Sequence, residues 1–254
     1  PLLSTLAHHS VEPARTRRAR PDMGEMARLG FIHAAPLVRF NENRSMFWEL
    51  SRLRTGEELE FIRNMLRRCG RKVSFRAEVA NTMNLTRLLH SGCLMLQYAG
   101  HGNDEYLAFE STTEWKCGIM EPLKMEYLKN LFRVGGIVKT QLVFISSCSS
   151  EASGNVFVAA GVPHVVAVKH NAGVTDGAAR EFATVFYDAL FENGGRSTVK
   201  QAFDMALNCV NATHLGAPNH EEDLFLLLPR DGNHDVRIFD TLPEGKLVDE
   251  THRL

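Results

Sequence analysis

Short apolar runs alternate with amphipathic segments along this chain, and the alternation continues from about residue 29 to residue 230. The apolar runs hold several Val, Ile, Leu or Phe residues in succession, which is typical of strands that are covered on both faces. In the segments between them, apolar side chains recur every three or four positions, which predicts helices with one buried face. The predicted strands cover residues 31–38, 73–77, 93–98, 142–145, 164–168 and 224–228, and the predicted helices cover residues 57–69, 84–90, 122–132, 154–160, 176–191 and 198–210.

This order of elements predicts an α/β fold, namely a three-layer α/β/α sandwich around a mostly parallel central sheet. We expect right-handed crossovers between the strands and a small hairpin arm at residues 106–110. In sheets of this kind, ligands and reactive groups collect at the carboxyl ends of the strands. The sequence contains no internal repeat with a period of about 20–50 residues, so it gives no support to a solenoid.

Composition narrows the class of protein without changing this picture. The chain has 254 residues, 44% of them hydrophobic and 23% charged, with a formal net charge of −1. These values are ordinary for a globular domain and predict no direct binding to nucleic acid. No apolar run approaches the roughly 18–20 residues needed to span a bilayer, so we expect no membrane association. The five cysteines form no C-x-x-C pair, which fits free thiols in a reducing compartment and predicts a cytoplasmic protein.

The two ends of the chain differ from its middle. Residues 1–28 are rich in arginine and hold little apolar periodicity, so we interpret them as a basic linker. The first residue is Pro, which suggests a piece of a longer polypeptide. Residues 231–254 are charged and are expected to form a tail or a linker to a further domain. The predicted domain itself covers residues 29–230.

Two strand-plus-turn motifs, Leu94–Gly102 and Gln141–Ser150, end in small, turn-forming residues. Each motif places one reactive side chain where its apolar run stops: His101 in the first and Cys148 in the second. Because the carboxyl ends of parallel strands meet at one edge of a sheet, we expect the two side chains to lie close together. A thiol and an imidazole in that arrangement form a nucleophile and its proton-transfer partner.

Each of these residues has a more ordinary interpretation when it is considered alone. A cysteine at the end of a buried strand is usually a small core side chain, and a histidine in a glycine-rich turn is usually part of the turn. Both together, each ending a separate strand, favour a Cys–His dyad. Backbone N–H groups at the start of a helix expected after Cys148 would favour a thiolate and hold an oxyanion. Gly102 would expose its N–H toward a substrate carbonyl.

Other polar residues offer weaker candidates. His33, His164 and His170 lack the spacing of a metal site, so we expect core or loop positions for them and no metal or cofactor. Asp176 follows Thr175 and resembles a helix cap or first-turn acid. One of four acidic residues near the predicted active edge could line a specificity pocket, although solvated charge or helix capping is the more common role: Asp104, Glu105, Glu151 and Asp176.

Four blocks of sequence carry a resemblance to a known family: Tyr98–Gly102, Ser147–Ser150, Ala160–Ala167 and Val174–Ala179, the last followed by Phe182, Phe186, Tyr187 and Leu190. In order and spacing they resemble the CHAT family of caspase-like cysteine proteases, over roughly residues 29–230. Separases and metacaspases share the broader fold.

The resemblance implies a catalytic histidine at His101, a nucleophile at Cys148 and an oxyanion hole formed by the backbone N–H groups of Gly102 and Cys148. It implies hydrolysis of peptide bonds through a thioester acyl-enzyme, without a metal. It also implies two kinds of partner: a protein or peptide substrate, and regulatory modules in the same polypeptide or complex.

The sequence departs from related proteases at two places. Metacaspases that cut after basic residues carry Asp two positions before the nucleophile, where this chain has Ser146, so that device for a basic preference is missing. A Trp that is common in the loop after the fifth strand is also missing, and residues 169–172 read Lys-His-Asn-Ala instead. Both departures concern the specificity of the substrate cleft.

Two rival interpretations remain open at this point. One is an inactive caspase-like scaffold that binds partners, against which the intact pair of reactive residues argues. The other is a Cys-elbow amidotransferase or hydrolase on a flavodoxin-like sheet. Those enzymes place the histidine after the cysteine in the chain, whereas here His101 comes before Cys148.

Overall fold

A computed structural model describes residues 26–41, 43, 45–112, 118–135, 139–170, 172–191, 195–214 and 223–251. The predicted basic linker therefore lies almost wholly outside the described residues, as does Cys117. No helix in the described part of the chain is both long enough and apolar enough to cross a membrane.

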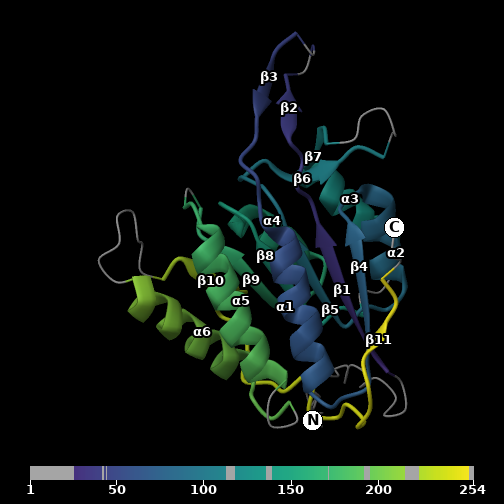
Figure 1. The fold of residues 1–254 in the computed structure, drawn as a ribbon, viewed down its shortest axis with the longest axis vertical. Helices are drawn as coiled ribbons and strands as arrows, with labels where there is room; N and C mark the ends of the chain where they lie inside the picture. Colours follow the sequence, from purple (N-terminus) through teal and green to yellow (C-terminus); the bar gives the residue numbers. More distant parts are fainter. Residues whose placement is uncertain are drawn as a thin grey trace, which may run out of the picture.

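One seven-stranded sheet forms the centre of the protein (Figure 1). Every pair of neighbouring strands in it is parallel except β10 and β9, which are antiparallel. This arrangement confirms the mostly parallel sheet predicted from the sequence. Its order is β10 (Phe225–Leu228), β9 (His164–Val168), β8 (Leu142–Ser146), β5 (Met95–Ala99), β1 (Ala27–His33), β4 (Val73–Val79) and β11 (Val248–Asp249).

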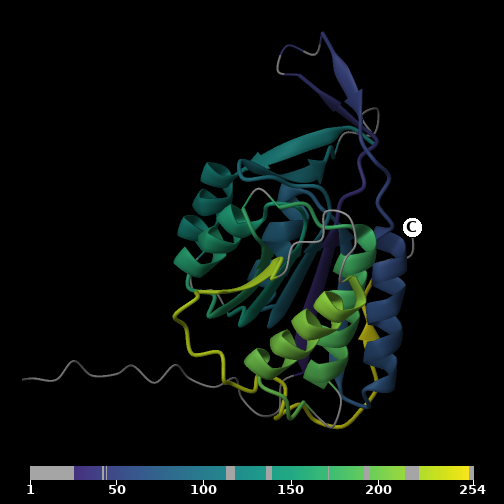
Figure 2. The same cartoon turned by 90° about the vertical axis from the view of Figure 1, so that its left-hand side faces the viewer.

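Helices cover both faces of the sheet, which confirms the three-layer sandwich (Figure 2). Side chains alternate along each strand, so the sheet contributes to two separate apolar cores. The continuous apolar runs of the sequence follow from this, because neither face of the central strands meets water. One core lies beneath α1 (Thr55–Arg68), α5 (Asp176–Phe191) and α6 (Val199–His214), and the other beneath α2 (Thr82–His90), α3 (Met125–Gly135) and α4 (Glu151–Ala159).

An aromatic cluster joins the sheet to α5 in the first core. The ring of Phe144 on β8 contacts Phe182, Phe186 and Phe225, and the rings of Phe182 and Phe225 stack with their centroids 4.0 Å apart. Each of these rings is fully buried. Burying a side chain of this size stabilises a fold by roughly 1.5–3 kcal/mol, so the cluster anchors β8 firmly against α5.

The predicted helix at residues 122–132 is wrong at its beginning. Residues Met120–Lys124 form strand β7, which pairs antiparallel with β6 (Tyr106–Glu110), and the helix α3 begins only at Met125. The apolar residues that predicted the helix, Leu128, Leu131 and Phe132, all lie within α3, whereas Leu123 before it is buried and pairs with Leu107 across the two strands. The arm expected at residues 106–110 is confirmed as one strand of this ribbon.

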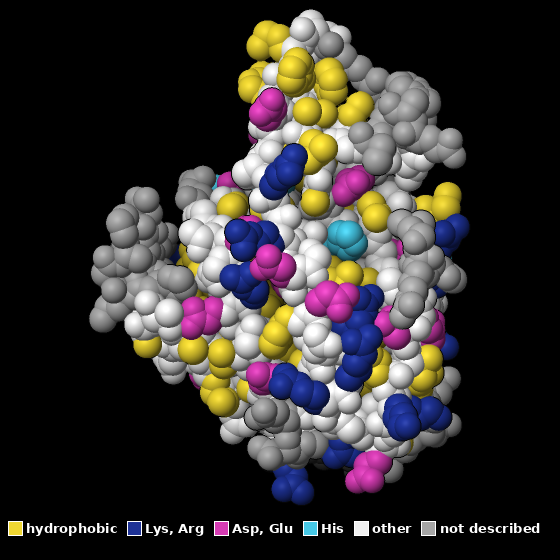
Figure 3. All heavy atoms as spheres, in the orientation of Figure 1, with side chains coloured by type: hydrophobic (Ala, Val, Ile, Leu, Met, Phe, Trp, Pro, Cys, Tyr) yellow, Lys and Arg dark blue, Asp and Glu magenta, His cyan; other side chains and the backbone are white. Residues whose placement is uncertain are grey.

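The predicted strand at residues 31–38 is also wrong in its extent. β1 ends at His33, and residues Val38–Phe40 form a separate strand, β2, which pairs with β3 (Phe47–Glu49). This hairpin projects beyond the sheet in Figures 1 and 2. Its side chains Phe47 and Trp48 are 60% and 47% exposed, and hydrophobic side chains gather on the surface of this projection in Figure 3. No burial pattern therefore marked β3 as a strand.

The segment after β10 packs along the domain. Phe239 is buried and stacks on Phe191 of α5, with ring centroids 4.3 Å apart. Farther on, β11 adds a short strand beside β4, and Glu250 accepts a hydrogen bond from the Ser74 hydroxyl at 2.5 Å. Whether residues 231–254 also lead to a further domain stays a prediction.

A buried pair of histidines predicts how stability depends on pH. His164 on β9 and His234 are both buried, with their Nδ1 atoms 2.8 Å apart. Burial, and secondly the neighbouring His234, lower the pKa of His164 to about 4. Because the unfolded chain binds this proton near pH 6.5, the free energy of unfolding should fall as the pH drops from about 6.5 to about 4, by at most ~3 kcal/mol.

Denaturant unfolding of the unmodified protein (the parent) and of His164→Gln between about pH 4 and about pH 6.5 measures the effect. Other groups titrate equally in both proteins, so the difference reports on His164. The variant should lose less stability than the parent on acidification. His90→Gln, which changes an exposed histidine, serves as the control. Parallel pH curves for the parent and His164→Gln would show that the pair does not cause the acid sensitivity.

Candidate active site

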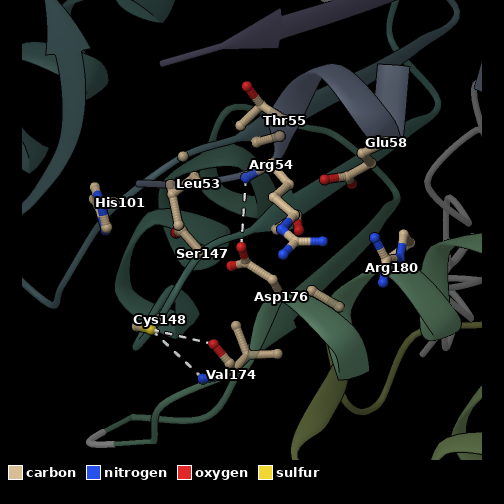
Figure 4. A pocket seen from close by; sticks show the side chains of 14 residues that line it. Leu53, Arg54, Thr55, Glu58, His101, Ser147, Cys148, Val174, Asp176 and Arg180 are labelled. Carbon is tan, nitrogen blue, oxygen red and sulfur yellow. Dashed lines mark hydrogen bonds between the residues drawn. The ribbon is translucent and has the colours of Figure 1, made fainter. Parts of the chain in front are cut away.

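The pairing of β5 with β8 brings the two predicted turns together. Ala99, the last residue of β5, lies opposite Ser146, the last residue of β8, and the Gly100 N–H donates to the Ser146 carbonyl at 3.2 Å. His101 and Cys148 each follow their strand end by two residues. Both line the same pocket at the carboxyl edge of the sheet (Figure 4). The structure therefore places the two sequence-predicted reactive residues at one site.

The turn that carries His101 is held by Tyr98 and requires glycine on both sides. The Tyr98 hydroxyl lies 2.8 Å from the His101 carbonyl oxygen and 2.6 Å from that of Ala108. A Cβ atom at Gly100 would lie 2.5 Å from the Tyr98 hydroxyl oxygen, and one at Gly102 would lie 2.8 Å from the Ser147 Oγ. The backbone of one turn thus packs directly against the other, which any larger side chain would prevent.

The imidazole of His101 is oriented by a backbone carbonyl from a distant segment. Its Nε2 lies 2.8 Å from the carbonyl oxygen of Ser51, in the stretch that precedes α1. A carbonyl can only accept a hydrogen bond, so Nε2 carries the proton and Nδ1 keeps the free lone pair of the neutral ring. This contact fixes which nitrogen can act as a base, and no feature of the sequence indicates it.

The thiol of Cys148 contacts the loop that follows β9. The Val174 N–H lies 3.5 Å from the Sγ and donates to it, and the Val174 carbonyl oxygen lies 3.9 Å away. The next residue, Ser149, has a φ of 46°, and its N–H donates to Ala172 at 3.0 Å. The helix α4 begins at Glu151, so Cys148 lies in the turn before it.

Gly102 and Cys148 each contribute a backbone N–H group to the two turns that carry the reactive side chains. Among the hydrogen bonds of the described residues, none uses the N–H of Gly102 or of Cys148. Free N–H groups on two adjoining turns are suited to binding an oxygen that becomes negatively charged during a reaction. The sequence interpretation named the same two groups as an oxyanion hole.

The pocket is closed on its other side by helices α1 and α5. One wall is formed at the start of α1 by Leu53, Arg54, Thr55 and Glu58, and another is formed at the start of α5 by Asp176, Ala179 and Arg180 (Figure 4). Of the four acidic candidates, Asp176 lines the pocket. It lies in the first turn of α5, and its Oδ2 accepts a 3.4 Å hydrogen bond from the backbone N–H of Arg54.

The acids Asp104 and Glu151 have other partners. Asp104 pairs with His170 at 2.7 Å, which links the loop after β5 to the loop after β9. Glu151 accepts hydrogen bonds from the His170 N–H at 3.1 Å and from Arg230 at 3.2 Å. These pairs tie together the loops around the pocket, while Asp176 alone of the predicted acids contributes to its lining.

Glu58 is a pocket residue that the sequence analysis missed. Its side chain is buried, and its carboxyl accepts hydrogen bonds from the Gln97 side-chain amide on β5 and from the Ser146 hydroxyl. The Gln97 oxygen in turn accepts a hydrogen bond from Tyr187 on α5. Burial, and secondly the charge of Asp176, raise the pKa of Glu58 to about 8. The signal that could have revealed it is Gln97, a polar residue within an apolar strand.

A family model described as the CHAT domain matches residues 4–210, and the chain belongs to this family. The match confirms the resemblance drawn from the sequence. No curated protein matches the chain significantly.

Solved structures with a similar fold include cysteine proteases. The arginine-specific cysteine proteinase gingipain R of Porphyromonas gingivalis is 13% identical with a TM-score of 0.54, over 85% of this chain and 48% of that one. A structure described only as a protease is 13% identical with a TM-score of 0.56, over 86% of this chain and 49% of that one. Caspase-1 from Spodoptera frugiperda is 12% identical with a TM-score of 0.49, over 98% of this chain and 100% of that one. The chain spans about half the length of the first two proteases, and the likeness to these two shows that it shares their fold.

The buried carboxyl of Glu58 predicts a second pH dependence, opposite in sign to that of His164. The folded protein holds the Glu58 proton up to about pH 8, whereas the unfolded chain releases it near pH 4.5. The folded state therefore binds more protons between these values, and the free energy of unfolding should decrease as the pH rises through this range. Glu58→Gln, which mimics the protonated carboxyl, should show a flatter slope in denaturant unfolding between pH 5 and pH 8. An unchanged slope would mean that Glu58 is ionised in the folded protein.

Proposed function

We propose that this protein is a cysteine endopeptidase in which Cys148 is the nucleophile and His101 the proton-transfer residue. The observation that carries the proposal is that both side chains line one pocket at the carboxyl edge of the sheet. Membership of the CHAT family and the caspase-like fold support the same class of reaction. We further infer that the domain works as a regulated module of a larger signalling protein or complex, as the family resemblance implies.

The reaction begins when Nδ1 of His101 takes the proton of the Cys148 thiol, and the resulting thiolate attacks a substrate carbonyl carbon. The carbonyl oxygen takes up the negative charge and accepts hydrogen bonds from the N–H groups of Gly102 and Cys148. When the C–N bond breaks, the protonated imidazole of His101 gives its Nδ1 proton to the departing amine. The product at this stage is a thioester between Cys148 and the acyl part of the substrate.

Water completes the cycle. His101, now neutral, accepts a proton from a water molecule at Nδ1 while the oxygen attacks the thioester carbonyl. The C–S bond breaks, the carboxylic acid product leaves, and the thiolate returns. The Ser51 carbonyl holds Nε2–H throughout, so the ring presents the same nitrogen to the amine and to the water. The contact also stabilises the imidazolium form, since both of its nitrogens are donors.

Replacement of the two residues tests the assignment. Cys148→Ala should reduce kcat/KM for peptide hydrolysis by at least about 10³-fold, because no other group can form the thioester. His101→Ala should reduce it by about 10²–10⁴-fold, because proton transfer to the amine is lost. Hydrolysis of a mixed peptide library is the measurement, and Cys209→Ala, which changes a half-buried cysteine of α6, is the matched control.

Peptidase activity that survives Cys148→Ala would refute the assignment. A thiol-reactive peptide probe separates the proposal from its main rival, an inactive scaffold. Such a scaffold would react at Cys148 no faster than at its other cysteines, whereas a protease would react there selectively and lose that selectivity in His101→Ala.

A further inference from the structure

We propose that the pocket beside Cys148 binds a lysine or arginine side chain of the substrate, and that Glu58 is the residue that selects it. This inference rests on the proposed function, because it assigns the pocket to the residue whose carbonyl Cys148 attacks. The charge of the occupant follows from which of the pocket's charged groups already have partners within the protein.

The two cations of the pocket already have a counter-charge. Arg180 donates to the carboxylate of Glu57, and the Arg54 guanidinium lies 3.4 Å from the same carboxylate. Both arginine side chains are also well exposed, at 42% and 68%, so solvent screens their charge. Glu57 does not line the pocket. An anionic substrate side chain would have to compete with Glu57 for either arginine.

The two carboxyls of the pocket differ from the arginines in forming no ion pair within the described residues. Among the described residues, neither Glu58 nor Asp176 forms an ion pair with a cation. The partners of the Glu58 carboxyl are the neutral side chains of Gln97 and Ser146. The charge of Asp176 acts on the pKa of Glu58 in the same direction as burial, and the charge of Arg180 acts in the opposite direction but more weakly. Glu58 holds a proton in the free protein, and an incoming cation favours the ionised carboxylate, so binding of the cation releases this proton and forms an ion pair at a buried position.

An unpartnered hydroxyl gives a second, independent indication of a ligand. Ser147 is 2% exposed, lines the pocket, and its Oγ has no hydrogen-bond partner among the described residues. A buried polar atom is normally satisfied, so this oxygen is available to a bound molecule. A lysine ammonium has three N–H donors and an arginine guanidinium has five. Such a group can use the Ser147 oxygen as well as the carboxyls.

The shape of the pocket suits a long side chain. In Figure 4, Cys148 lies at one end of the lining residues and Glu58 at the other, with Asp176 between them. The lining also includes the apolar side chains of Leu53 and Val174, which can pack against the methylene groups of a lysine or arginine. The charged tip would then reach Glu58 while the backbone stays beside the thiol.

The test compares substrates that differ only in charge at this position. Peptide libraries carry arginine, lysine, citrulline, norleucine or aspartate before the scissile bond, with the other positions mixed. Citrulline matches arginine in shape but is neutral. We expect kcat/KM for arginine or lysine to exceed that for citrulline or norleucine by at least about tenfold. Glu58→Gln should bring the arginine-to-citrulline ratio close to one.

Two further variants keep the test interpretable. Glu60→Gln removes an exposed acid from the same helix, outside the pocket, and should leave the ratio unchanged. Asp176→Asn should lower the ratio about threefold, and it serves if Glu58→Gln fails to fold. Thermal unfolding of each variant establishes that it is folded before its kinetics are measured.

Peptide binding to Cys148→Ala, followed by fluorescence anisotropy, separates this inference from the proposed function. Tighter binding of arginine peptides than of citrulline peptides, lost in the double variant with Glu58→Gln, supports the inference even if nothing is cleaved. Cleavage with no preference for arginine over citrulline, or with a preference for aspartate, overturns the inference and leaves the proposed function intact. If no peptide is bound or cleaved, both are wrong.

Discussion

The register between β5 and β8 is the constraint on which the rest of the site depends. Ala99 and Ser146 lie opposite each other at the ends of these strands. Each reactive side chain follows two residues later, so any shift in pairing would separate the imidazole from the thiol. The register is fixed by burial: Tyr98 and Ile145 face one core, and Phe144 faces the other. A slip of one residue would exchange the two faces, so packing of the core determines the position of the site.

A buried polar network connects this sheet to the helices that close the pocket. Gln97 lies on the same face of the sheet as the aromatic cluster around Phe144, where an unsatisfied amide would cost about 1–3 kcal/mol. Glu58 from α1 and Tyr187 from α5 both bind this amide. Two helices are thereby held against one side chain of β5. The pocket lies between those helices, so the network that satisfies Gln97 also sets the width of the pocket.

The sequence predicts what depends on local periodicity and on short motifs. Both reactive turns could be placed because an apolar run that ends in small residues marks the edge of a buried strand. The features that the sequence could not predict depend on contacts between distant segments. The hairpin β2–β3 leaves Phe47 exposed, so no burial pattern identifies it. The Ser51 carbonyl binds His101 through its backbone, which any residue type could do. Glu58 belongs to no motif, and its partners Gln97 and Ser146 lie on other elements.

The electrostatic character of the pocket illustrates the same limit at a single position. In the sequence, the neutral residue Ser146 suggests that the end of β8 contributes no negative charge to substrate recognition. In the structure the Ser146 hydroxyl hydrogen-bonds to the carboxyl of Glu58, which reaches the end of the strand from α1. An acidic residue at position 146 would place a second carboxyl group beside Glu58 at a buried position, where two neighbouring carboxyls cannot both be ionised. A small neutral hydroxyl is therefore what allows an acid from another element to occupy this place. The charge of such a pocket depends on side chains from several elements, so no single position in the sequence predicts it.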